Sequence, residues 1–186
     1  KLAHFVVGGS AHPLMDINES KNTLVLVLSS ERGLCGGYNS NMTKQAQKTI
    51  DELKDNGENV YVVGIGKKAF LSLVRRKKLE GKMSAQEEAT HISEKEYTEK
   101  PTLLLSSSTM TLLSTPFDKP NYDAAEVLAE SIAELYTTKK IGKLVVVYSK
   151  FQSAMSQTPT TKFILPIKPK DDYVAEPIFF FFFEEI

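Results

Sequence analysis

The chain reads Leu-Val-Leu-Val-Leu at residues 24–28 and then Ser-Ser-Glu-Arg-Gly-Leu-Cys-Gly-Gly-Tyr-Asn-Ser-Asn at residues 29–41. The first run is apolar throughout and too short for a helix, which is typical of a strand covered on both faces. Similar runs occur at residues 60–63 (Val-Tyr-Val-Val) and 144–148 (Leu-Val-Val-Val-Tyr). The three runs predict a largely parallel sheet that lies between layers of helices.

A helical segment separates the first two predicted strands. Its apolar residues recur at spacings of three and four, so they share one face of a helix: Met42, Ala46, Ile50 and Leu53. We expect Asn39 or Ser40 to cap the start of this helix. The pair Asn56-Gly57 is expected to end it in the left-handed conformation.

Two more helices complete the predicted pattern. A shorter one follows Gly66 and is expected to bury Phe70, Leu71 and Val74. Another begins at about Asn121, and its inner face carries four regularly spaced apolar residues: Ala125, Leu128, Ile132 and Leu135. The alternation predicts an α/β fold, with an open, mostly parallel sheet, helices on both faces and Rossmann-like layering.

The remaining segments are less regular. Residues 75–100 are dense in Lys and Glu, which predicts a solvated surface excursion. Residues 102–113 contain two leucine runs and favour another strand or a short helix. The tail after Pro166 has a loop-like composition and includes five consecutive phenylalanines, Phe179–Phe183. We therefore expect residues 1–22 to be a lead-in segment, residues 24–167 to hold the sheet and helices, and residues 168–186 to be an exit segment.

Composition narrows the class of protein. The 186 residues suit one large domain, and 23 basic residues balance 23 acidic ones. This balance gives no reason to expect a nucleic-acid partner, which normally requires a basic excess. The single cysteine, Cys35, cannot form an internal disulfide and indicates a reducing compartment. No apolar run approaches the roughly 20 residues of a membrane-spanning helix, so we expect no direct membrane insertion.

Residues Gly64-Ile-Gly-Lys-Lys-Ala69 fit the dinucleotide-binding pattern G-x-G-x-x-G/A. They follow a predicted strand and open a predicted helix, where backbone N–H groups could receive a pyrophosphate. The pattern is short, however, and it does not follow the first strand. No strand ending in an acidic residue follows about 20 positions on. We prefer to interpret it as a tight turn that needs small residues, with a dinucleotide-dependent enzyme as the alternative.

The second glycine cluster spans Arg32-Gly33-Leu34-Cys35-Gly36-Gly37 and follows the first strand directly. A mononucleotide could lie here in a flavodoxin-like binding module, although Leu34 and Cys35 stand where a phosphate cradle would have small or polar residues. A nearby helix N-terminus and Arg32 would favour a Cys35 thiolate, but no histidine is close in sequence to act as its base. The histidines form no metal-ligand spacing with Cys35 or with an acidic pair. We therefore predict no catalytic, cofactor-binding or metal site.

Several motifs, in order, resemble one known family. Residues 29–41 closely resemble the Ser/Thr-Asp-Arg-Gly-Leu-Cys-Gly signature of the central domain of F-type ATP synthase γ subunits, with Glu31 in place of the usual Asp. Residues 63–68 (Val-Gly-Ile-Gly-Lys-Lys) are similar to the family's Ile-Gly-Lys-Lys/Arg turn. Residues 147–151, 155–159 and 165–167 resemble its Tyr-Asn-Lys-Phe, Met-Ser-Gln-x-Pro and Leu-Leu-Pro-Leu series. The resemblance covers almost the whole chain and is weakest from residue 75 to residue 120.

This resemblance implies a non-catalytic rotor subunit without a cofactor. In the family, long terminal helices form a coiled-coil shaft, and neither helix is recognisable in this sequence. The implied partners are the ATP synthase α and β subunits, an ε-type subunit and the c-ring. Arg32 to Gly37 would then face the acidic C-terminal loop of a β subunit, with Arg32 as its electrostatic partner and Cys35 as a packing residue. The expected location is peripheral, on the cytoplasmic face of a bacterial plasma membrane, with the mitochondrial matrix side or the thylakoid stromal side as alternatives.

Overall fold

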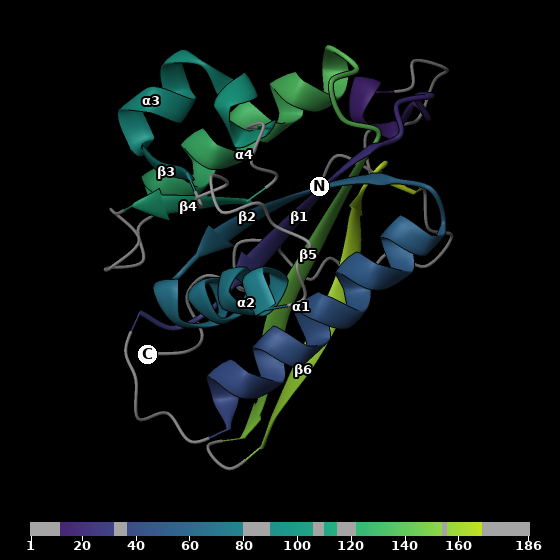
Figure 1. Cartoon of the computed structure of the whole chain (residues 1–186). Helices are drawn as coiled ribbons and strands as arrows, with labels where there is room; N and C mark the ends of the chain where they lie inside the picture. Colours follow the sequence, from purple (N-terminus) through teal and green to yellow (C-terminus); the bar gives the residue numbers. More distant parts are fainter. Residues whose placement is uncertain are drawn as a thin grey trace.

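The computed structural model describes residues 12–31, 37–79, 90–105, 110–114, 122–153 and 156–168. Within these ranges the protein has an α/β fold in which helices cover both faces of a six-stranded sheet (Figure 1). The predicted fold class is therefore confirmed.

The sheet is parallel except at one edge. Its spatial order is β3-β4-β2-β1-β5-β6, and only β6 runs antiparallel to its neighbour. The strands are β1 (Asn22–Leu28), β2 (Asn59–Ile65), β3 (Thr90–Ser93), β4 (Met110–Ser114), β5 (Lys143–Ser153) and β6 (Ser156–Leu165). The three predicted apolar runs became β1, β2 and β5, which lie side by side with β1 in the middle.

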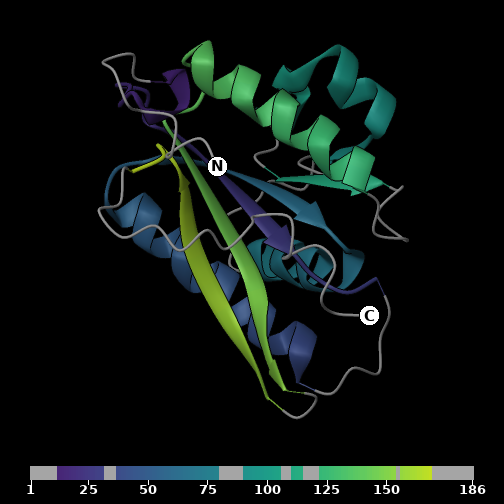
Figure 2. The ribbon, with the colours of Figure 1, turned by 180° about the vertical axis from the view of Figure 1, so that it is seen from behind.

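Helices α1 (Tyr38–Asp55) and α2 (Lys67–Leu79) pack against one face of the sheet. Helix α4 (Tyr122–Thr137) covers the other face together with α3 (Glu94–Glu99), as the two opposite views in Figures 1 and 2 show. Two short 3-10 helices, η2 (Pro13–Met15) and η3 (Pro101–Leu105), lie on the α4 side. The layering follows from the preference for right-handed crossovers. The connections β1–β2 and β2–β3 step one way along the sheet, and the connections β3–β4 and β4–β5 step the other way, so their helices cover opposite faces.

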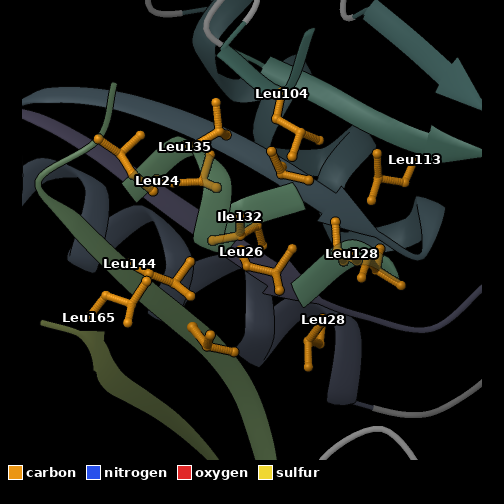
Figure 3. Packing of buried hydrophobic residues seen from close by; sticks show 14 of the residues in the cluster. Leu24, Leu26, Leu28, Leu104, Leu113, Leu128, Ile132, Leu135, Leu144 and Leu165 are labelled. Carbon is orange, nitrogen blue, oxygen red and sulfur yellow. The ribbon is translucent and has the colours of Figure 1, made fainter. Parts of the chain in front are cut away.

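The core has two halves, separated by β1. Leu24, Leu26 and Leu28 point toward α4, where Leu128, Ile132 and Leu135 meet them (Figure 3). Val25 and Val27 point the other way, toward α1 and α2. Because successive strand side chains alternate between faces, the apolar run of β1 supplies both halves. The predicted inner faces of α1 and α4 are confirmed, since each of their predicted residues is at least 95% buried.

The two ends of α1 differ in how well they were predicted. Gly37 is the N-cap residue, and it already has helical dihedral angles, so Asn39 and Ser40 lie inside the first turn. The hydroxyl of Ser40 instead donates to the carbonyl of Gly37 at 2.9 Å. The capping prediction was therefore wrong. The predicted stop is confirmed, because Gly57 has a φ of 80° and donates its N–H to the carbonyl of Lys54 at 2.9 Å.

Helix α2 buries a different leucine from the one predicted. Phe70 and Val74 are buried as expected, but Leu71 is 42% exposed and Leu73 is 1% exposed. A helix turns by about 100° per residue, so Leu73 and Val74 return to the face of Phe70 whereas Leu71 points away from it.

The Lys- and Glu-rich stretch 75–100 contains more regular structure than predicted. Helix α2 extends to Leu79, and β3 and α3 occupy residues 90–99, where Ile92 is buried. The prediction of a plain surface excursion was therefore wrong for these parts. Residues 102–113 contain both predicted alternatives, because η3 is followed by β4.

Strand β6 was not predicted as a strand. Its residues 157–162 are polar except for Pro159, which cannot donate a hydrogen bond to a sheet. Pro159 is tolerated because β6 is an edge strand, paired only with β5.

The phenylalanine run lies outside the described residues. In the described part of the chain, no helix has both the length and the apolar character needed to cross a membrane.

The neighbouring leucines of α2 give a direct test of this packing. We expect Leu73→Ala to lower the free energy of unfolding by about 2–4 kcal/mol, because it leaves a cavity in the core. We expect Leu71→Ala to lower it by less than about 1 kcal/mol, since much of that side chain is already in water. Urea unfolding followed by circular dichroism measures both. Equal losses would contradict the described orientation of α2.

Candidate subunit-contact site

The predicted contact loop, Arg32 to Gly37, follows the central strand β1 in sequence. Residues 32–36 (Arg32, Gly33, Leu34, Cys35 and Gly36) lie outside the described residues, so the structure describes only Gly37 of the six. Its flanks are placed at the exit of β1 and at the start of α1. This edge of an α/β sheet is where loops most often form binding sites.

Ser29 joins the exit of β1 to the turn after β2. Its N–H donates to the carbonyl of Ile65 at 2.8 Å, and its hydroxyl donates to the carbonyl of Gly66 at 2.8 Å. The same hydroxyl oxygen accepts the N–H of Ala69 at 3.3 Å. One side chain therefore fixes the base of the contact loop to the beginning of α2.

The first turn of α2 has little room for a phosphate group. The N–H groups of Lys68 and Ala69 already donate to Ser30 and Ser29, at 3.2 Å and 3.3 Å. A Cβ atom on Gly66 would lie 1.9 Å from the carbonyl oxygen of Ser29, so the backbone just after β1 lies directly against Gly66. The arrangement favours the tight-turn interpretation over the dinucleotide alternative.

Each glycine of this turn has a packing role. Gly66 has a φ of 88°, which side-chain-bearing residues rarely adopt, and it touches the Ser29 backbone. A Cβ on Gly64 would lie 2.4 Å from the ring of Phe70, so the absence of a side chain lets that ring pack flat on β2. The glycine pattern thus serves close contact between strand and helix.

An ion pair links the contact loop to α2. Lys67 Nζ lies 3.5 Å from a carboxylate oxygen of Glu31, the residue directly before the loop. Both side chains are partly exposed, so the pair contributes at most about 1 kcal/mol. Its main effect is geometric, because it holds the loop's first flank beside the start of α2.

The described residues contain no group of three or more side chains suited to hold a metal ion. His12 has a structural contact, since its Nδ1 accepts the N–H of Leu14 at 3.3 Å at the start of η2. His4 and Cys35 lie outside the described residues.

A second junction, at the opposite end of the strands, joins residues 14–18 to the end of β6 and to the end of α4. The N–H of Ile167, just after β6, donates to the carbonyl of Leu14 at 2.9 Å. The hydroxyl of Tyr136 donates to the carbonyl of Asp16 at 2.6 Å, and the Asn18 amide donates to the carbonyl of Ile141 at 3.0 Å. Sequence reasoning missed this junction, although Tyr136 continues the inner-face spacing of α4 four residues after Ile132.

The same end of the strands holds a polar cluster around Glu58. The side chain of Glu58 is 11% exposed and accepts hydrogen bonds from Thr23 of β1 and Lys143 of β5. A nearly buried carboxylate is stable only when it is paired and hydrogen-bonded, and both conditions are met here. Glu58 thus ties the amino ends of the two strands to the loop that precedes β2.

Comparison with known proteins assigns the class. A sequence model of the ATP synthase family matches residues 2–180, nearly the whole chain. The chain is therefore a member of the ATP synthase family.

The curated relatives define the subunit. The chain is 29% identical over 168 residues to the ATP synthase gamma chain of Trichlorobacter lovleyi, covering 90% of this chain and 48% of that protein. It is 30% identical over 175 residues to the gamma chain of Geobacter metallireducens, covering 92% and 50%. The chain belongs to the ATP synthase γ-subunit family, and it spans about half the length of these two relatives.

A solved structure was also matched. One chain of the central stalk and c-ring of the Tetrahymena thermophila mitochondrial ATP synthase is 17% identical, with a TM-score of 0.48. The match covers 89% of this chain and 55% of that chain.

Two glycines with positive φ allow the close contact at Gly66 to be tested. We expect Gly66→Ala to lower the free energy of unfolding by about 3 kcal/mol or more, because backbone strain adds to a clash with Ser29. The matched control is Gly57→Ala, which has a similar φ of 80° and nothing within 4 Å of the added Cβ. Gly57→Ala should lower the free energy of unfolding by only about 1–2 kcal/mol, from backbone strain alone. Equal losses in urea unfolding would show that the contact with Ser29 is unimportant.

Tyr136 gives a pH-dependent test of the second junction. Burial, and secondarily the negative charge of Asp16, raises the pKa of Tyr136 above its ordinary value of 10.0. Its contribution to stability is therefore complete below pH 10 and is lost as the pH rises further, because the unfolded chain releases the proton first. We expect Tyr136→Phe to be less stable than the parent at pH 8 by about 1 kcal/mol. The difference should shrink at pH 11 in urea unfolding, and a constant difference would contradict the assignment.

Proposed function

We propose that this chain forms the globular domain of a rotary central stalk in an F-type ATP synthase. In this role it transmits torque between an ion-driven membrane ring and the catalytic subunits, and it performs no chemistry itself. The proposal rests on membership of the γ-subunit family and on one structural observation, the backbone hydrogen bond between Leu14 and Ile167.

That hydrogen bond supports the proposal because it would bring both connections to a shaft to one point of the domain. Leu14 and Ile167 are 153 positions apart in sequence, yet their backbones are in direct contact. Polypeptide arriving at Leu14 and leaving from Ile167 would run side by side from one point. A two-helix shaft needs this geometry at its foot.

The interior of the domain is packed in a way that suits the transmission of torque. Strand β1 is buried on both faces, and the junction is held by Tyr136 and Asn18 through hydrogen bonds to backbone carbonyls. Close-packed interiors transmit strain with little deformation. A domain built in this way can move as one body when the shaft turns.

The loop from Arg32 to Gly37 is our candidate contact with a catalytic subunit. We propose that Arg32 faces the acidic C-terminal loop of a β subunit, while Cys35 packs near that contact. Support comes from the residues before the loop, since Ser29 lies at the carboxyl end of β1 and is hydrogen-bonded to Ile65 and Gly66. A contact that must transmit force needs such an anchored base.

The proposed mechanism is conformational coupling. An asymmetric shaft makes different contacts with three otherwise equal catalytic subunits, so its angle changes their relative nucleotide affinities. The proposed partners are α and β subunits, an ε-type subunit and a ring of c subunits. The proposed location is the cytoplasmic face of a bacterial membrane, with the corresponding sides of mitochondrial or thylakoid membranes as alternatives.

A chimera tests the proposal. Residues 12–168 would replace the matching region of the Geobacter metallireducens gamma chain, and the product would be reconstituted with purified α and β subunits. We expect ATP hydrolysis that depends on the chimera, and none from the 186-residue chain alone. Arg32→Glu should weaken the association of the chimera with α and β about fivefold, because it reverses a charge that faces an acidic loop.

The matched control for the charge reversal is Lys54→Glu, at an exposed position near the end of α1. It should leave association unchanged. A chimera that fails to assemble, together with tight binding of a nicotinamide or flavin by the chain, would overturn the proposal and favour the dinucleotide alternative.

A further inference from the structure

Helix α2 concentrates positive charge that the rest of the chain does not share. Its 13 residues include six that are basic and none that is acidic: Lys67, Lys68, Arg75, Arg76, Lys77 and Lys78. The whole chain has a formal net charge of zero, so the rest of it is correspondingly acidic. The charge is thus gathered on one element.

The outward face of α2 carries much of this charge. Ala69, Phe70 and Leu73 fill the core between α2, α1 and the sheet. The opposite side, here called the basic face, is formed by Lys68, Leu71, Ser72, Arg75 and Arg76. Among the residues that the structure describes, none forms an ion pair with Lys68, Arg75 or Arg76.

Helix stability explains only part of this pattern. Cations in the last turn interact favourably with the helix dipole, which accounts for the basic residues after Val74. Lys67 and Lys68 stand in the first turn, where the dipole disfavours cations. Glu31 compensates Lys67, but no described carboxylate compensates Lys68. A negative charge from outside would remove this cost.

We propose that the basic face of α2 is a docking site for an acidic segment of a protein partner. Guanidinium groups of Arg75 and Arg76 can pair with carboxylates through two hydrogen bonds each. Leu71, 42% exposed between these cations, offers an apolar contact of the kind found within protein interfaces. This surface adds a second contact to the proposed stalk domain, on α2 rather than on the loop after β1.

A protein partner fits better than a lipid surface. Helices that lie on membranes bury their apolar face in the headgroup region. The apolar face of α2 is already used, since Phe70 and Leu73 are at most 1% exposed inside the core. Among the α2 side chains whose burial the structure describes, Leu71 is the one large apolar side chain left to enter a bilayer.

The test uses a fluorescein-labelled decaglutamate peptide and the 186-residue chain. We expect fluorescence anisotropy at 50 mM NaCl to show binding, which 300 mM NaCl weakens about tenfold because exposed charges are screened. Arg75→Gln combined with Arg76→Gln should weaken binding about fivefold. The matched control removes two exposed lysines from the turn after α4, Lys139→Gln with Lys140→Gln, and should bind like the parent.

Three results would overturn the inference. One is the absence of peptide binding by a folded parent chain, and another is an equal loss in both double variants. The third is binding to vesicles containing phosphatidylglycerol without binding to the peptide, which would assign the face to anionic lipid. Circular dichroism and urea unfolding of each variant would show that it is folded. None of these results depends on assembly with α and β, so failure here is distinguishable from failure of the stalk proposal.

Discussion

Strand β1 contributes side chains to both halves of the core, and this double burial constrains everything built around it. Leu24, Leu26 and Leu28 belong to the half under α4, and Val25 and Val27 belong to the half under α1 and α2. A one-residue shift in the pairing register of β1 would turn each set of side chains to the opposite face of the sheet, where neither set would fit. The register of β1 with β2 and β5 is therefore fixed, and with it the positions of the segments that leave each end of the strand.

From this fixed strand the two functional regions follow in opposite directions. At its carboxyl end, Ser29 connects the base of the contact loop to Gly66 and the start of α2. At its amino end, Thr23 and Glu58 tie β1 to β5. Asn18, in the segment before the strand, bonds to the backbone after α4. The segments that lead into the candidate contact loop and into the proposed attachment point thus lie at opposite ends of the same strand.

Much of this arrangement could be predicted, because burial on both faces leaves a strong local signal. The apolar runs of β1, β2 and β5 and the spacings in α1 and α4 located the central layers. The errors occurred where local signals are weak or compete. Leu71 was assigned to the core by composition, although the turn of the helix directs it outward. β6 was missed because an edge strand with one exposed side can be polar and can even contain Pro159.

The candidate sites were predictable to different degrees. The loop from Arg32 to Gly37 was found from its family motif, a signal contained in the sequence itself. The bond between Leu14 and Ile167 was not, because it joins two backbone groups and depends on no side-chain pattern. Two residues of the basic face, Arg75 and Arg76, lie in the stretch 75–100, whose Lys and Glu content predicted only a solvated surface. The one-sided charge of α2 is clear from its bounds, because the helix ends at Leu79 and contains no acidic residue.

The bond between Leu14 and Ile167 also bears on how such a domain could have arisen. A module in which the chain enters and leaves at adjacent residues can be inserted into a host chain without forcing the host's flanking residues apart. A pair of antiparallel helices joined by a short turn could accept this domain within the turn and keep its own packing. Deleting the domain would leave two helix ends still close enough to be joined by a few residues. The fold is in this sense separable from any shaft that carries it.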